Sequence, residues 1–130
     1  MSKKIFMDKY PIYSIEIQNN NTNYTTIDEI INHLKILIEN HKIATFISIF
    51  DHYSHTVSIN GEINSSIKDA KNLIFCFGAA IPNTEIMAVR PRSFGISKLE
   101  DSFKIEFLEA PKEQLTVLMQ EWANTLNNKG

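Results

Sequence analysis

The sequence predicts a single α+β domain over residues 1–130: a ferredoxin-like sandwich with a largely antiparallel, five-stranded sheet, two main amphipathic helices on one face and one short helix. Three observations carry this prediction. The length is that of one domain, hydrophobic residues make up 43% and charged residues 22% of the chain, and apolar residues follow helical spacing in two segments but strand-like patterns between them. This composition excludes a disordered or collagen-like chain.

The first half of the chain predicts a strand, a helix and a second strand. Over residues 10–17 apolar and polar side chains alternate, as in a half-buried strand. Thr26 and Glu29 match a capping box, and apolar residues follow at helical spacing, so a helix is expected over 26–40. Residues 43–50 are almost all apolar, which indicates a strand covered on both faces.

The middle of the chain predicts a short helix and two strands. Ile63, Ile67 and Ala70 suit one short helix within residues 58–72. Residues 73–80 form a second continuous apolar strand. Residues 86–96 are expected to be extended, as an edge strand or a bent one, because Pro91 cannot donate to a ladder.

The last third predicts a hairpin and a closing helix. Residues 98–101 suit a turn that leads into a strand over 102–109. Pro111 is placed to open a helix, because a first-turn residue has no use for its amide hydrogen. The apolar stripe of that helix consists of Leu115, Leu118, Met119, Trp122 and Leu126.

This arrangement predicts a partner. Two helices can cover only one face of the sheet, yet the strands around Ile43 and Leu73 look apolar on both faces. A symmetric partner subunit, a rolled sheet or an apolar ligand could cover the second face, and a homodimer is the commonest solution.

The order of the elements carries a resemblance. From Phe75 to Pro111 it resembles the uncharacterised bacterial family numbered three hundred and two among domains of unknown function. Residues 50–55, 75–78 and 89–93 are more closely similar to a small uncharacterised family of short bacterial proteins. Neither resemblance implies an activity, a substrate or a cofactor; both imply the fold and a cytoplasmic protein.

Charge and targeting signals exclude several partners. A net charge of −2 without a basic cluster argues against nucleic acid. The chain has no apolar run of about 18 residues, so no membrane span is expected. Cys76, the single cysteine, lies in an apolar run and is expected to be buried rather than nucleophilic. We therefore expect a cytoplasmic protein.

Asp51, His52 and His55 form the first candidate site. Histidine and carboxylate side chains bind transition metals, and an aspartate can orient a histidine that acts as a base. An extended strand would place the two histidines on opposite faces, whereas a helical turn would bring them together. Glu62 or Glu85 could supply a third ligand. The alternative is a pair of histidines hydrogen-bonded at a strand end.

Arg90, Arg92 and Ser93 form the second candidate site. The chain has 13 basic residues, of which only these two are arginines, and they lie two positions apart. A guanidinium can form two parallel hydrogen bonds to a carboxylate or phosphate, which the lysine ammonium cannot do. The alternation of side chains along a strand would place both guanidinium groups on one face. The alternative is a set of salt bridges across the hairpin or to a partner subunit.

Three functional hypotheses follow. The first is a homodimeric binding module that holds a small, anionic ligand near Arg90, Arg92 and Ser93. The second is a metal-dependent or acid–base enzyme that uses Asp51, His52 and His55. The third is a structural dimer in which these side chains pair across the interface. The residues identify no cofactor.

Overall fold

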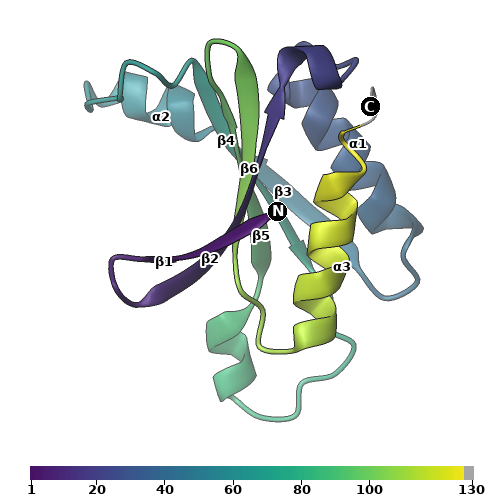
Figure 1. Ribbon diagram of the computed structural model, residues 1–130. Helices are drawn as coiled ribbons and strands as arrows, with labels where there is room; N and C mark the ends of the chain where they lie inside the picture. The colour runs from purple at the N-terminus through teal and green to yellow at the C-terminus, as the bar shows by residue number, and fades with distance from the viewer. Residues whose placement is uncertain (128–130) are drawn as a thin grey trace.

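All the strands join one antiparallel sheet. The computed structural model describes residues 1–127, and its six strands follow the order β1-β2-β6-β5-β4-β3 (Figure 1). The strands are β1 (Ser2–Phe6), β2 (Tyr10–Gln18), β3 (Thr45–Phe50), β4 (Asp69–Cys76), β5 (Arg92–Lys98) and β6 (Ser102–Leu108). The helices are α1 (Ile27–Asn40), α2 (His52–Ser58) and α3 (Glu113–Asn124), with short 3₁₀ turns η1 (Asn19–Asn21) and η2 (Glu85–Val89). The α+β prediction is confirmed.

Helix α1 begins where the capping box predicts. The Glu29 amide donates to the Thr26 hydroxyl over 3.2 Å, and the Thr26 amide donates to the Glu29 carboxylate over 3.1 Å. These bonds satisfy amide groups that a helix start otherwise leaves unpaired. Helices α1 and α3 lie side by side against the same face of the sheet (Figure 1).

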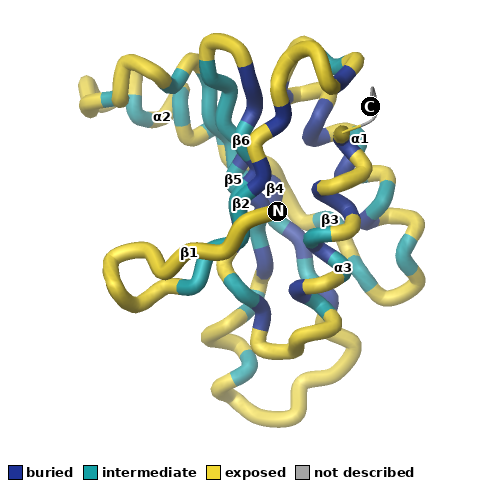
Figure 2. Tube along the Cα trace, in the orientation of Figure 1, coloured by how far each residue is buried: buried dark blue, intermediate teal, exposed yellow. Residues whose placement is uncertain are grey.

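The core lies between that face and the two helices, where buried residues concentrate (Figure 2). The rings of Phe75 and Phe94 stack at 5.2 Å on neighbouring strands, and Trp122 of α3 stacks on Phe77 at 5.4 Å. The whole apolar stripe predicted for the closing helix packs into this core, with Leu115 and Leu118 partly buried and Met119, Trp122 and Leu126 fully or nearly so, although Leu126 lies just beyond the end of α3.

The prediction of five strands is wrong, because the N-terminal residues add a sixth. Strand β1 pairs only with β2, and all of its residues are exposed, so neither burial nor alternation marks it in the sequence. The two strands form a hairpin that projects from the sheet (Figure 1). The ferredoxin-like arrangement is not confirmed, since that unit follows a β-α-β-β-α-β order.

Four element predictions are also wrong. The strand expected over 73–80 is β4, which begins at Asp69 and ends at Cys76. The short helix does not lie within 58–72; it is α2, which begins directly after β3. Residues 86–89 are not extended but belong to η2. The closing helix begins at Glu113 rather than at Pro111, and its N-cap is Lys112.

The outer face of the sheet is more polar than predicted. Ile74 and Cys76 of β4 do point outward. The outward residues of β5, β6 and β2 that flank them are mainly polar, however: Ser93, Ser97, Lys104, Glu106, Ser14 and Glu16. Polar side chains can remain in water, but β3 leaves Ile47, Ile49 and Phe50 exposed, so the strand predicted over 43–50 is not covered on both faces.

Candidate functional site

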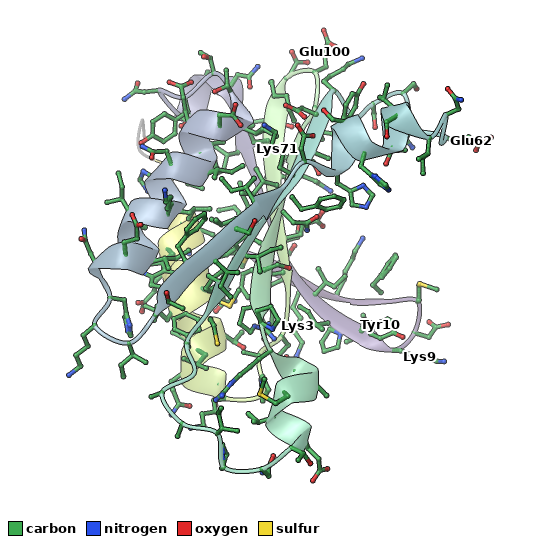
Figure 3. All side chains as sticks on the ribbon, turned by 180° about the vertical axis from the view of Figure 1, so that it is seen from behind. Lys3, Lys9, Tyr10, Glu62, Lys71 and Glu100 are labelled. Carbon is green, nitrogen blue, oxygen red and sulfur yellow. The ribbon has the colours of Figure 1, made fainter. Side chains whose placement is uncertain are left out.

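An open pocket of about 480 Å³ lies at one end of the sheet. Because β2 and β5 run in the same direction and β6 runs against both, the starts of β2 and β5 meet the end of β6 there. The β1–β2 hairpin, which carries Tyr10 (Figure 3), contributes one wall, and η2 contributes another. The lining residues are Tyr10, Pro11, Ala88, Val89, Pro91, Arg92, Ser93, Leu108, Glu109, Ala110 and Pro111.

Arg92 is the buried cation of this pocket. As the first residue of β5 it lies beside Phe75 of β4, and only 8% of its surface is exposed. One guanidinium nitrogen donates to the Leu108 carbonyl, while Nε is buried without a hydrogen-bond partner. Among residues 1–127, no carboxylate forms an ion pair with Arg92. Burial lowers the pKa of the guanidinium, which nevertheless stays charged in proteins.

Arg90 takes a different position from Arg92. Its guanidinium lies over Gly78, so closely that a Cβ on Gly78 would come within 2.6 Å of the Arg90 Cζ. Arg90 Nη1 donates to the Ala80 carbonyl over 2.7 Å. Arg90 therefore fastens residues 78–80 to the start of β5 and does not line the pocket. The expectation that both guanidinium groups share one face is wrong, because Arg90 precedes the strand.

The rim of the pocket carries a compensated negative charge. Glu109 pairs with Lys3 of β1 at 2.8 Å and accepts a hydrogen bond from the Tyr13 hydroxyl over 3.3 Å. The bond from Lys3 lowers the pKa of the Glu109 carboxyl, so Glu109 is ionised at neutral pH. These residues also line a second hollow of about 320 Å³ beside α3. Glu109 is thus paired with Lys3 of the β1–β2 hairpin, whereas Arg92 forms no ion pair within residues 1–127.

Asp51, His52 and His55 lie at the opposite end of the sheet, where β3 ends. They do not continue the strand, because the Asp51 carboxylate caps α2 and accepts bonds from the amide and hydroxyl of Ser54, both over 3.0 Å. The bond from the Ser54 amide is the main cause of the lowered pKa of Asp51. Lys71 adds an ion pair at 3.7 Å.

The helical turn brings the two histidine rings together, with 6.4 Å between their centroids. Both rings are exposed, and His52 Nδ1 contacts the Thr56 hydroxyl at 3.2 Å. Within the described part of the chain, no three histidine, cysteine, aspartate or glutamate side chains are grouped to hold a metal ion. Glu62 lies at the far tip of the loop after α2 (Figure 3), and Glu85 belongs to η2.

Cys76 ends β4 at the same end of the sheet as Arg92, and its side chain is half-buried rather than fully buried. Its sulfur accepts a hydrogen bond from the Gly78 amide over 3.2 Å. The structure therefore brings Cys76 and Arg92 to one end of the sheet and leaves Asp51, His52 and His55 at the other.

Sequence reasoning missed most of the walls of the pocket. Tyr10 and Pro11 come from the start of β2, and residues 108–111 follow β6. One signal was partly available, because Pro11 and Pro111 lie at predicted element boundaries, whereas Pro91, which directly precedes β5, was expected inside an extended segment. Only the strand order, which the sequence does not reveal, brings these boundaries together.

No helix in residues 1–127 combines the length and the apolar character that a membrane span needs. A search of curated proteins and a search of solved structures each found no match to the chain. The resemblance to the family numbered three hundred and two is not confirmed, because the matching family model is a different one. That model covers residues 1–128, and the chain belongs to the family of unknown function DUF6858.

Proposed function

We propose that this protein binds a small organic anion in the pocket at the start of β5, with Arg92 as the anion-binding group. One observation carries the proposal: Arg92, an arginine with only 8% of its surface exposed, a buried Nε and no carboxylate partner within residues 1–127, lines an open pocket of about 480 Å³. Small-molecule sites have volumes of about 300–1,000 Å³. A buried charge is ordinarily paired, because removing an unpaired ion from water costs on the order of several kcal/mol.

The guanidinium is also held in a fixed orientation. Its bond to the Leu108 carbonyl joins β5 to the end of β6, so the fork cannot swing freely into solvent. Ser93 also lines the pocket, but it follows Arg92 along β5, so its side chain projects from the opposite face of the strand. Of the three residues predicted for a ligand site, the proposal keeps Arg92 as the anion-binding group and Ser93 as a lining residue, and it assigns Arg90 to the support of the neighbouring loop.

The test is an NMR titration of the full chain with benzoate, in which the Nε–Hε signal of Arg92 is followed. We expect a saturable shift of that signal in the wild type. In Arg92→Lys the charge remains but the fork is lost, so benzoate affinity should fall about tenfold or more, given the ~1.5–3 kcal/mol of a charged hydrogen bond. Arg90→Lys is the matched control and should bind as the wild type does.

A second pair of variants avoids the buried strand end, where a substitution could impair folding. Val89 and Met87 are both exposed residues of η2, but only Val89 lines the pocket. Val89→Glu should weaken benzoate binding by charge repulsion, whereas Met87→Glu should leave it unchanged. Absence of benzoate binding to the wild type, or equal effects of the two glutamates, contradicts the proposal.

Other parts of the initial hypotheses stay predictions. The homodimer, the cytoplasmic location and the bacterial origin are expectations from the sequence. The homodimer stays open because the middle strands are mainly polar on their outer face while β3 exposes apolar residues, and native mass spectrometry of the purified protein would count the subunits. The enzyme hypothesis gains no support from His52 and His55, which are exposed and lack a third ligand within residues 1–127.

A further inference from the structure

The lining of the pocket contains few hydrogen-bond donors. Three of its eleven residues are prolines, namely Pro11, Pro91 and Pro111, and proline has no amide hydrogen. The amide of Glu109 already donates to the Pro11 carbonyl over 2.9 Å, and the amide of Ala110 donates to the Thr116 hydroxyl over 2.9 Å. Phosphate sites in proteins typically offer a set of free backbone amides or several cations. In the lining of this pocket Arg92 is the one cation, and the amides of Glu109 and Ala110 are already bonded.

The charge at the pocket suits a monoanion. Arg92 contributes one positive charge, and Glu109 contributes the only carboxylate of the lining. Lys3 neutralises Glu109 from the hairpin side but does not itself line this pocket. A dianion would bring a second negative charge close to Glu109 without a second cation to balance it. A single carboxylate matches the guanidinium fork in both charge and shape.

The remaining walls are apolar. They come from three separate segments and consist of Pro11, Ala88, Val89, Pro91, Leu108, Ala110 and Pro111. Leu108 and Val89 are 46% and 41% exposed, so an apolar ligand placed against them would remove hydrophobic surface from water. The pocket thus combines one buried cation with an extended apolar wall.

From these features we infer that the ligand is an organic monocarboxylate with an apolar body, whose carboxylate meets Arg92 and whose body lies against Leu108 and Val89. This inference rests on the proposed function and narrows it to one class of anion. It predicts that affinity grows with the apolar length of the ligand and falls when a second charge is added.

Isothermal titration calorimetry of the full chain tests the inference with acetate, hexanoate, hexanol and inorganic phosphate. We expect hexanoate to bind at least about tenfold more tightly than acetate, because it buries four more methylene groups at ~0.8 kcal/mol or less each. Hexanoate should also bind at least about tenfold more tightly than phosphate, which lacks the apolar body, and than hexanol, which lacks the carboxylate.

Variants on the apolar wall locate the effect. Leu108→Ser should lower hexanoate affinity about tenfold and leave acetate unchanged, since only the longer ligand reaches that wall. Val117→Ser is the matched control, because Val117 is 42% exposed on α3 and does not line the pocket.

The possible outcomes separate the inference from the proposed function. If phosphate binds as tightly as hexanoate and Arg92→Lys weakens both, the anion site stands and the monocarboxylate class is wrong. If hexanol binds as tightly as hexanoate, the apolar wall acts alone and both are wrong. If none of the four probes binds, the proposed function itself fails.

Discussion

His33 of α1 ties three segments together through both of its ring nitrogens. Nδ1 lies 2.9 Å from the Tyr24 hydroxyl, and Nε2 lies 2.7 Å from the Thr125 hydroxyl. The Thr125 hydroxyl donates its one hydrogen to the Trp122 carbonyl, so Nε2 must be the donor to Thr125. Burial lowers the pKa of the ring and so favours its neutral form, in which Nδ1 accepts the hydrogen bond from Tyr24.

His33 should make stability depend on pH. Because the folded-state pKa lies below the unfolded value of about 6.5, the unfolded chain binds a proton more readily. Stability is thus expected to be full above about pH 6.5 and to decline as the pH falls toward the folded-state pKa. Urea denaturation at several pH values measures this decline. His33→Gln, which cannot titrate, should show a flatter profile; an equally steep profile would assign the decline to other groups.

At the scale of the element, local signals explain what the sequence could predict. Helix α1 follows from its capping box and apolar stripe, which act within a few residues of one another. Helix α2 could not be predicted in this way, because the sequence alone suggests that Asp51 is a polar strand end. In the structure the Asp51 carboxylate instead caps α2 by accepting a hydrogen bond from the Ser54 amide. Strand β1 lacks any buried residue, and η2 is a turn of five residues, none of them buried, so neither leaves a periodic apolar pattern.

The capping box gives a measurable prediction. Thr26→Ala removes the hydroxyl that accepts from the Glu29 amide, and the free energy of unfolding should fall by about 1 kcal/mol. Thr84→Ala is the control, because Thr84 holds the N-cap of η2 without a side-chain hydrogen bond. Urea denaturation of both variants measures the difference. Equal losses would show that the capping bond contributes nothing of its own.

Over the whole molecule, the candidate site depends on the order of the strands. The sequence points to Arg92 and Ser93 through the rarity of arginine, but it does not show that Tyr10 and Leu108 lie beside them. That proximity arises from the pairing of β2 with β6 and of β6 with β5, which are long-range contacts. The same alternation that places Phe94 in the core places Arg92 two residues before it, at the buried end of the strand.

The core between the sheet and helices α1 and α3 dominates the stability of the fold. Phe94 is fully buried, stacks on Phe75 and meets Phe107 edge to face at 5.5 Å. Phe94→Ala should lower the free energy of unfolding by about 3–5 kcal/mol, through lost burial and a cavity. Phe6→Ala, in the exposed hairpin, should change it by less than about 1 kcal/mol. Chemical denaturation compares the two, and similar losses would contradict this placement of the core.

The strand order also sets a sequence of events for a chain that emerges from the ribosome. Strands β3, β4, β5 and β6 are consecutive neighbours and can pair as they are made. Strand β2 is made early but pairs with β6, so Ile15 must wait for Ile105. Contacts between such distant parts of a chain slow folding. The N-terminal hairpin therefore remains without its neighbour until most of the chain has been synthesised, and the pocket, which needs β2 beside β6, is completed among the last parts of the fold.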